Sequence, residues 1–242
     1  MANPEIKRNS MWGGILHIKQ MGFAPKTVID VGAALGTFQL YEGFPQARHV
    51  LIEPIAENEP YLAQICQTLA NAEYLIAAAT SQPGTATLQI APELVHSSAA
   101  VDSVSKGASV KDERYMTRTI PAITLDQLCI ERQLEPPYLV KIDVDGNEAD
   151  VIAGATETLK QTEYAVVEVS LFGQIHTVIE LMKSQGFVIY DILDLDCRPG
   201  DQALWQADMA FVKAAGQFRQ NTAYMPPSNQ ERLSRNLRAY RD

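Results

Sequence analysis

The stretch that decides the fold is Thr27-Val28-Ile29-Asp30-Val31-Gly32-Ala33-Ala34-Leu35-Gly36. Its apolar first half is typical of a buried parallel strand, and its glycines predict a sharp turn into a helix. A second apolar run, Val50-Leu51-Ile52-Glu53-Pro54, also ends in an acid. An acid at the tip of the next strand can accept hydrogen bonds from the two hydroxyls of a ribose. The two runs together predict a nucleoside site at the carboxyl ends of neighbouring strands.

The glycine spacing indicates which nucleoside fits. The dinucleotide fingerprint needs glycines at its first, third and sixth positions, to hold a pyrophosphate. Counted from Gly32, the later positions are Ala34 and Thr37, and the chain also lacks the Gly-Lys-Ser/Thr ending of a phosphate-binding loop. A nucleoside without phosphates fits better, and S-adenosylmethionine is the common one. Its ammonium group would be attracted by Asp30, and we expect Gly32 and Ala34 to leave space for it. The alternative is an ordinary strand-to-helix turn with a solvent-exposed Glu53.

Composition narrows the class of protein. The chain has 242 residues, of which 46% are hydrophobic, and this is enough for the core of one large domain. Its net charge is −9 and no basic stretch is interleaved with aromatics, which argues against a nucleic-acid partner. Three scattered cysteines, Cys66, Cys129 and Cys197, predict neither a disulfide framework nor a zinc site. No apolar run reaches the roughly 20 residues of a membrane span, and the charged N-terminus is unlike a signal peptide. We expect a cytoplasmic protein with no membrane span, and leave a homodimer open.

Strands and helices are expected to alternate along the chain, which predicts an α/β fold with a mostly parallel sheet and helices on both faces. After the first two strands, further strands are expected at Tyr74–Ala79, Tyr138–Asp143 and Ala165–Val169, and a terminal antiparallel hairpin at Phe187–Ile192 and Met209–Val212 with the loop Asp194–Ala207 between. Helices are expected at Leu35–Tyr41, Ile55–Leu69, from Thr124, at Asn147–Lys160 and at Ile175–Gln185.

Three regions follow from this reading. Residues 1–22 are expected to form an N-terminal helical cap, residues 23–218 the main domain, and residues 219–242 a tail or terminal helix. Within the main domain, residues 92–117 have no sustained period and are predicted to be a long loop. Long loops in compact domains are often functional, so we look there for substrate contacts.

A second block of interest is Lys141-Ile142-Asp143-Val144-Asp145-Gly146-Asn147-Glu148, at the end of one strand and the start of a helix. Ligands of open α/β sheets bind outside the carboxyl ends of the strands. Asp143 and Asp145 are therefore expected near the nucleoside. Glu148 lies in the first turn of the helix, where the helix dipole stabilises a carboxylate whatever its function.

These two blocks, together with Glu53-Pro54, Ala77-Ala78, Gly154-Ala155 and Val167-Glu168-Val169, resemble the FkbM family of S-adenosylmethionine-dependent methyltransferases, from about Phe23 to Phe218. The resemblance implies the class I methyltransferase fold, a Rossmann-like sheet of seven strands with one antiparallel C-terminal strand. It also implies O-methylation of a hydroxyl on a sugar, polyketide or similar small molecule. Two positions depart from the family pattern, Asp145 for the usual Glu or Gln and Ala34 for the common Asn or Ser.

The resemblance implies that Asp30, Gly32 and Ala34 line the methionine moiety and that Glu53 holds the ribose. The expected cofactor residues are Asp30, Gly32, Ala33, Ala34, Gly36, Glu53, Pro54, Ala78 and Asp143.

A hydroxyl acceptor needs a general base, because it is a poor nucleophile. Candidate bases are Asp145 and His96 first, then Asp143, and then His176. Ser97, Ser98, His176 and Gln206 are candidate substrate contacts. Asp143, Asp145 and Glu168 could converge on a metal, but none is predicted, since the Asp143 block lacks the glycine spacing of a calcium loop.

Two other functions compete with methyl transfer. A nicotinamide-dependent oxidoreductase would also use a nucleoside site, although the failed glycine fingerprint disfavours it. A noncatalytic protein that kept the nucleoside pocket is the other alternative.

Overall fold

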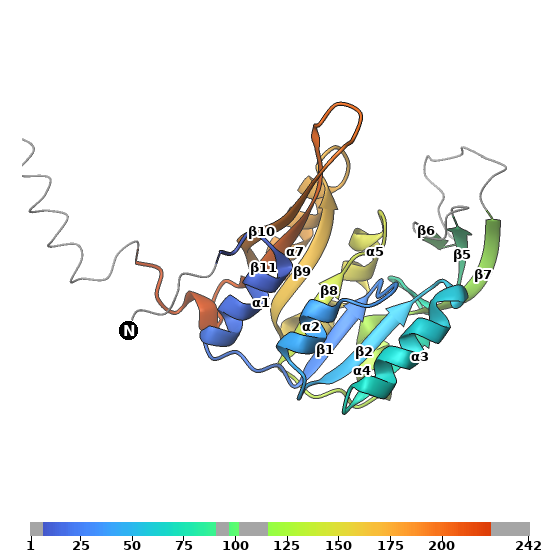
Figure 1. The fold of residues 1–242 in the computed structure, drawn as a ribbon, viewed down its shortest axis with the longest axis horizontal. Coiled ribbons are helices and arrows are strands. Elements are labelled where there is room, and N and C mark those ends of the chain that lie inside the picture. Colours follow the sequence, from blue (N-terminus) through green and yellow to red (C-terminus); the bar gives the residue numbers. More distant parts are fainter. Residues whose placement is uncertain (1–6, 91–96, 102–115, 224–242) are drawn as a thin grey trace, which may run out of the picture.

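A computed structural model describes residues 7–90, 97–101 and 116–223. Its centre is a seven-stranded sheet in the order β10-β11-β9-β8-β1-β2-β3, in which β11 runs antiparallel to both of its neighbours (Figure 1). The other strand pairs, from β9 to β3, are parallel. The seven strands are β1 (Thr27–Val31), β2 (Arg48–Glu53), β3 (Ala72–Ile76), β8 (Tyr138–Ile142), β9 (Thr162–Ser170), β10 (Phe187–Cys197) and β11 (Leu204–Lys213). The predicted class I methyltransferase fold, with one antiparallel strand near the C-terminus, is confirmed.

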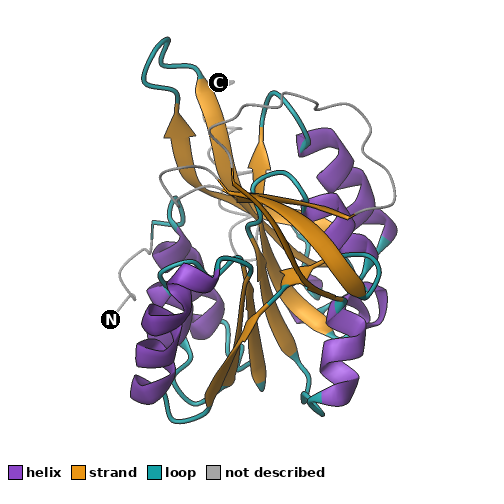
Figure 2. Cartoon of the chain, turned by 90° about the vertical axis from the view of Figure 1, so that its right-hand side faces the viewer, coloured by secondary structure: helices purple, strands orange, loops and turns teal. Residues whose placement is uncertain are grey.

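Helices cover both faces of this sheet (Figure 2). One face packs against α1 (Met11–Gln20), α2 (Phe38–Gly43) and α3 (Glu59–Thr68). The other packs against α4 (Leu125–Glu131), α5 (Glu148–Ala153), α6 (Thr156–Lys160) and α7 (Ile175–Ser184). Residues of the central strands are buried on both faces, as in β1 and β8, where every residue is buried. Such strands read as continuous apolar runs, which is why they were predictable.

Several boundaries differ from the predicted ones. The chain predicted as one strand at Tyr74–Ala79 divides into β3 and the short β4 (Ala78–Ala79), which belongs to another sheet. The helix predicted from Ile55 begins with a 3-10 turn, η1 (Ala56–Asn58), before α3. The helix predicted at Asn147–Lys160 is two helices, α5 and α6, which are separated at Gly154. A Cβ on Gly154 would lie 2.0 Å from the carbonyl oxygen of Thr80, so the break lets two backbones come close.

The terminal hairpin is longer than predicted. The segment Asp194–Ala207, expected as a loop, mostly belongs to β10 and β11, and only residues 198–203 join them. Figure 1 shows this hairpin extending well beyond the rest of the sheet. A hydrogen bond connects the start of α1 to this hairpin, because the Met11 amide donates to Asp194 Oδ2 of β10 at 2.5 Å. A last 3-10 turn, η2 (Gln217–Arg219), follows.

A second sheet replaces part of the predicted loop. Its order is β4-β7-β5-β6, with β5 at Gly84–Ile90, β6 at Ser97–Val101 and β7 at Met116–Ile123. The prediction of a loop over 92–117 is therefore wrong for β6 and for the start of β7. The backbone of β6 pairs with β5 in antiparallel register, and this satisfies backbone groups that a loop would leave open.

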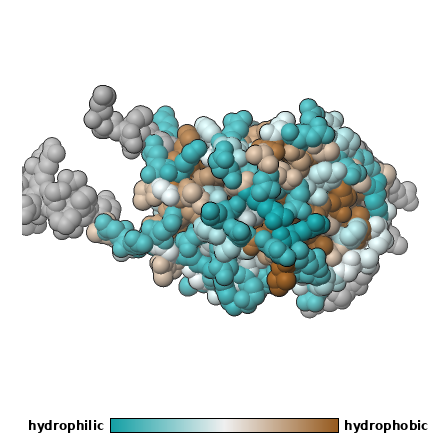
Figure 3. Space-filling view, turned by 90° about the horizontal axis from the view of Figure 1, so that it is seen from below, coloured by the Kyte–Doolittle hydropathy of each residue, from teal (hydrophilic) through white to brown (hydrophobic). Residues whose placement is uncertain are grey.

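The surface opposite the carboxyl ends of the strands is seen from below in Figure 3. Hydrophilic side chains dominate it, and hydrophobic ones form smaller groups between them. Among the described residues, no helix is long and apolar enough to cross a membrane. The domain limits at residues 22 and 218 stay predictions.

Candidate active site

A cavity of about 850 Å³ lies at the carboxyl ends of β1, β2 and β8, where the sequence predicts the nucleoside. This volume is within the range of small-molecule and cofactor sites. One part of its wall comes from the turn after β1, the end of β2 and η1. Another part comes from β8, β9 and the β10–β11 hairpin. The lining residues used below are Gly32, Ala33, Ala34, Gly36, Glu53, Pro54, Asn58, Ala78, Lys141, Asp143, Asp145, Glu168, Asp194, Asp196, Gln206 and Asp208.

The turn after β1 has a left-handed backbone at Gly32, whose φ is +75°. A Cβ on Gly32 would lie 1.6 Å from the carbonyl oxygen of Asp143. Glycine is therefore required because the backbone of β8 passes so close, and not only because a ligand needs the space. This close approach brings the two predicted motifs of the sequence together.

Glu53 is built into the same turn. Its Oε2 accepts a hydrogen bond from the Ala34 amide at 2.8 Å, and its Oε1 accepts from the Ile55 amide at 2.9 Å and from Asn58 Nδ2 at 3.2 Å. Ala34 has a φ of +43°, so the Glu53 carboxylate holds a strained residue in place. Glu53 is 3% exposed, which excludes the alternative of a solvent-exposed acid.

Burial shifts the ionisation of Glu53. It raises the pKa of the carboxyl group, and the hydrogen bonds from Ile55, Ala34 and Asn58 oppose that rise. A carboxylate offers about four acceptor positions, and three are used by the protein. About one acceptor position remains for a ligand, which is fewer than the two hydrogen bonds predicted from a ribose.

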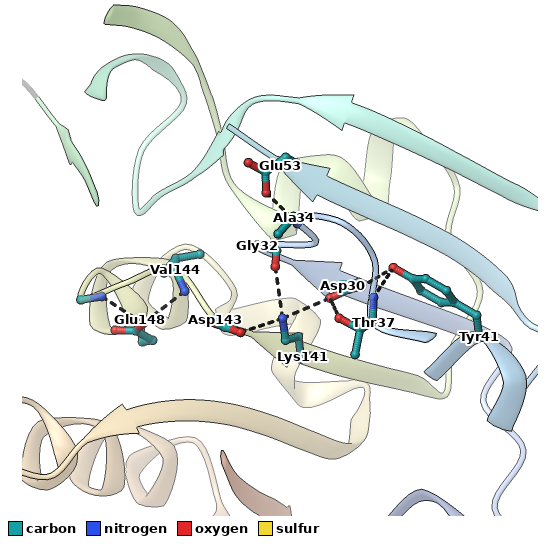
Figure 4. A network of polar contacts seen from close by, with 11 residues as sticks. Asp30, Gly32, Ala34, Thr37, Tyr41, Glu53, Lys141, Asp143, Val144 and Glu148 are labelled. Carbon is teal, nitrogen blue, oxygen red and sulfur yellow. Dashed lines mark hydrogen bonds and ion pairs between the residues drawn. The ribbon is translucent and has the colours of Figure 1, made fainter. Parts of the chain in front are cut away.

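Lys141 connects the turn to the Asp143 block (Figure 4). Its ammonium group donates to the Gly32 carbonyl at 3.1 Å and lies 3.0 Å from Asp143 Oδ2 and 3.7 Å from Asp30 Oδ1. Burial alone would lower the pKa of Lys141, but Asp30 and Asp143 outweigh it and the net pKa is raised. Lys141 is therefore a permanent buried cation that joins β1 to β8.

Asp30 lies beneath the cavity and does not line it. Its carboxylate is fully buried and accepts from the Tyr41 hydroxyl at 2.5 Å and from Thr37 Oγ1 at 3.1 Å, besides its ion pair with Lys141. The structure thus does not bring Asp30 into direct contact with a ligand's ammonium group. Its role in this arrangement is to anchor α2 and Lys141 under the glycine turn.

Carboxylates crowd the opposite end of the cavity. Glu168 of β9 pairs directly with Asp208 of β11, so that their side chains lie on one face, and Asp143 follows β8 on the other side of β9. Asp194 and Asp196 of β10 line the same region. Among the described lining residues, Lys141 is the only cation, and Asp30 and Asp143 already pair with it.

This crowding changes the ionisation of two groups. Burial, with the nearby carboxylates of Asp143, Asp145, Asp208 and Glu148, raises the pKa of Glu168 to about 8. Burial and Asp143 raise the pKa of Asp208 to about 7, against the opposing charge of Lys141. Like charges in a partly buried site cannot all ionise without cost, so near neutral pH this end retains protons.

Glu148 has a structural role. It is fully buried, and its Oε1 accepts from the Val144 and Gly146 amides at 3.2 and 3.1 Å (Figure 4). These bonds hold the turn that carries Asp145, whose φ is +52°. Glu148 is outside the cavity lining, in agreement with the alternative that explains it by the helix start.

The structure brings most of the predicted site residues together. Those at the cavity are Gly32, Ala33, Ala34, Gly36, Glu53, Pro54, Ala78, Asp143, Asp145 and Gln206. His176 is not among them, because it is exposed on α7. His96 lies outside the described residues. Only the backbone of Ser97 and Ser98 is described, in β6, where they pair with Ile90 and Gln89.

Sequence reasoning missed Lys141 as a site residue, and it named Glu168 and Asp208 near the site without predicting that they pair. Lys141 stands within the block that was singled out, and a charged residue inside an apolar strand was the available signal. Glu168 and Asp208 each stand between apolar neighbours in a strand. Such a pattern gives no information on the partner across the sheet, so their pairing was not visible.

Comparisons with known proteins agree with this reading. The model of the FkbM methyltransferase domain matches residues 30–189. Nothing among the curated proteins matches the chain.

Similar solved structures include the pre-rRNA processing protein fibrillarin of Methanococcus jannaschii, with 13% identity and a TM-score of 0.46, over 88% of this chain and 70% of that one. Magnesium protoporphyrin IX methyltransferase of Synechocystis PCC 6803 has 8% identity and a TM-score of 0.46, over 84% and 76%. The N-methyltransferase NodS of Bradyrhizobium japonicum WM9 has 10% identity and a TM-score of 0.44, over 84% and 93%. The family match covers more than half of the chain and both predicted motifs, and so the protein belongs to the FkbM methyltransferases, with S-adenosylmethionine as cofactor.

Proposed function

We propose that the protein transfers a methyl group from S-adenosylmethionine to a hydroxyl of an uncharged small molecule, such as a sugar or a polyketide. The observation that carries this proposal is the row of carboxylates from β8, β9 and β11 at one end of the cavity. The other end, with the glycine turn and Glu53, suits the cofactor.

The residues at the cofactor end fit S-adenosylmethionine. Glu53, at the end of β2, is placed to accept a hydrogen bond from the ribose. The backbone of Gly32 to Gly36 borders the cavity with small side chains, so the methionine part of the cofactor can lie against it. Pro54 and Ala78 supply apolar surface on the same side for the adenine ring. When bound, the cofactor supplies a methyl group that is already activated on a sulfonium.

The charge at the other end indicates the class of acceptor. A phosphorylated acceptor would bring its charge close to Asp143, Glu168 and Asp208, where the only lining cation among the described residues is already paired. Repulsion between such groups is strong in a partly buried cavity. Hydroxyls, in contrast, can donate hydrogen bonds to carboxylates. The site therefore favours neutral, hydroxyl-rich acceptors over nucleic acids and other polyanions.

Of the predicted catalytic residues, Asp143 and Asp145 line the cavity. Asp143 lies at the cavity, but one of its oxygens is held by Lys141 at 3.0 Å. Asp145 also lines the cavity, from the turn that Glu148 holds. Gln206, from β11, is placed to contact the acceptor.

The test is a methyl-transfer screen with S-adenosylmethionine labelled on its methyl group. The acceptor panel holds neutral sugars, polyketide alcohols, small amines and RNA. The expected product is a neutral compound whose mass has increased by one methyl group, in a linkage that survives alkali as an ether does. Labelling of RNA alone, or of an alkali-labile carboxyl ester alone, would contradict the proposal.

A further inference from the structure

We propose that Glu168 takes the proton from the acceptor hydroxyl during methyl transfer, and that the charge of its cross-strand neighbour Asp208 tunes Glu168 for this role. This inference rests on the proposed O-methylation and assigns a base that differs from Asp145, His96 and Asp143.

A second cavity, of about 580 Å³, adjoins the first. Its lining shares Asp143, Glu168, Asp194, Asp196, Gln206 and Asp208 with the main cavity, and it shares none of the residues of the glycine turn or of β2. The shared residues thus mark the junction of the two cavities. With the cofactor against the glycine turn, the second cavity is the space left for an acceptor, and the transferred methyl group has to cross at this junction.

Glu168 is the carboxylate at the junction that is best placed to react. Asp143 is tied to Lys141, and Asp194 accepts the Met11 amide at 2.5 Å. Glu168, in contrast, makes no hydrogen bond or ion pair with any other described residue, and it is half-buried, so its oxygens can meet an acceptor. A base must lie within hydrogen-bond reach of the proton that it takes.

Asp208 is the nearest neighbour of Glu168 across the sheet. The two residues pair directly in the antiparallel register of β9 and β11, and this register prevents them from moving apart. The negative charge of Asp208 is one of those that favour the protonated form of Glu168, so the ionisation of the two groups is linked.

The charged groups that act on Glu168 are carboxylates. The carboxylates that face it are Asp143 and Asp145 after β8, Glu148 of α5 and Asp208 of β11, and all of them favour its protonated form. Lys141 acts on Asp208 in the opposite sense, while Asp194 acts with the carboxylates. The resulting pKa values, about 8 and about 7, lie close to the pH at which a general base works best.

The acceptor oxygen forms a bond to the methyl carbon while the carbon–sulfur bond breaks and its electron pair stays on sulfur. The hydroxyl proton passes to the Glu168 carboxylate. The products are a methyl ether, S-adenosylhomocysteine and protonated Glu168, which then releases its proton to solvent.

The experiment compares Glu168→Gln with the wild type, using an acceptor found in the screen. We expect kcat to fall by about 100-fold or more. We expect kcat/KM of the wild type to rise between about pH 7 and 8, and this rise should disappear in Glu168→Gln. Calorimetry should show S-adenosylhomocysteine affinity within about threefold of the wild type, since Glu168 lies apart from the glycine turn. Glu180→Gln, an exposed glutamate on α7, is the control and should behave as wild type.

Asp208→Asn supplies a second readout. Loss of the neighbouring negative charge should lower the pKa of Glu168 and move the rise of kcat/KM to lower pH. A merely structural role for the pair would not move the profile in this way. A wild-type profile in both variants would overturn the assignment.

A measurement without turnover separates this inference from the proposed function. Carboxyl-labelled glutamate, followed by carbon NMR in the ligand-free protein, should show one group that titrates near pH 8 and is absent from Glu168→Gln. If no glutamate titrates above pH 6, the assignment of Glu168 is wrong even where methyl transfer succeeds. If the titration is present and no hydroxyl compound is methylated, the proposed function fails, and the catalytic role of Glu168 fails with it.

Discussion

The two ends of the cavity differ in whether the protein itself provides partners for their carboxylates. At the cofactor end, the carboxylates are satisfied by the protein: Glu53 accepts three hydrogen bonds, and Asp30 is bound by Tyr41, Thr37 and Lys141. At the acceptor end, Glu168 and Asp208 face other carboxylates and have raised pKa values. Carboxylates that the protein already binds keep the cofactor end of the cavity in one conformation, which suits a cofactor that is the same in every reaction. Carboxylates without such partners can still bind an acceptor and take up protons. Their mutual repulsion lowers the stability of the folded protein.

The largest effect on stability is expected from replacing Lys141, which pairs with two carboxylates at the cofactor end. Lys141→Met would leave the carboxylates of Asp30 and Asp143 without their cation, and Asp30 is fully buried. Removal of one partner from a buried ion pair costs about 3–5 kcal/mol. Denaturant unfolding should show this loss in the free energy of unfolding. Lys160→Met is the control, because that exposed lysine pairs with Glu157 at the surface, where a salt bridge is worth at most about 1 kcal/mol. Equal losses in the two variants would show that the buried network is unimportant.

The next effect concerns the close approach of β1 and β8. Gly32→Ala places a Cβ against the Asp143 carbonyl and strains a left-handed residue, so we expect a loss of roughly 3 kcal/mol of stability. Gly22→Ala is a matched control. Gly22 also has a positive φ, of +84°, but its Cβ would meet nothing within 4 Å, so it should lose only about 1 kcal/mol. Thermal unfolding of both variants measures the difference, and the absence of a difference would contradict the role given to Gly32.

Cofactor affinity should respond to Glu53. Glu53→Ala removes the acceptor expected for the ribose and releases Ala34, so the affinity for S-adenosylhomocysteine should fall by about 1.5–3 kcal/mol. Glu59→Ala is the control, since Glu59 lies on α3 outside the cavity lining and contacts the Tyr74 hydroxyl at the surface. Calorimetry compares the two, and unchanged binding in Glu53→Ala would remove Glu53 from the ribose.

The crowded carboxylates at the acceptor end should make the free energy of unfolding depend on pH. The pKa values of Glu168 and Asp208 are raised above their ordinary values of 4.5 and 3.8, so the folded protein binds these protons more tightly than the unfolded chain. Stability is therefore expected to fall as the pH rises from about 4 through 8. We expect a loss on the order of 1–3 kcal/mol between pH 6 and 8 in the ligand-free protein, and a smaller loss in Glu168→Gln. A free energy of unfolding that increases over this range would be inconsistent with crowded carboxylates.

The cofactor end could be predicted from the sequence better than the acceptor end. Gly32 and Glu53 belong to short local motifs, and the chemistry of such motifs can be read from neighbouring residues. The role of Asp30 was misjudged because Tyr41 and Lys141, which use its carboxylate, come from α2 and β8. Contacts of this kind depend on packing between distant segments.

The acceptor end depends still more on long-range pairing. Glu168 and Asp208 come together through the register of β9 and β11, and no local pattern specifies a register between strands. The second sheet was missed for the same reason, because β6 is a short run of small residues that becomes a strand only beside β5. Strand propensity in such segments reflects the neighbours across the sheet more than the segment itself.

The most direct measurement is methyl transfer to a matched pair of acceptors, a neutral hydroxyl compound from the screen and the same compound carrying a phosphate away from the reacting hydroxyl. At about pH 9, where Glu168 and Asp208 are ionised, we expect kcat/KM to be at least about tenfold higher for the neutral compound, because the carboxylates of Asp143, Glu168 and Asp208 repel the phosphate. Equal rates, or a preference for the phosphorylated compound, would contradict this expectation.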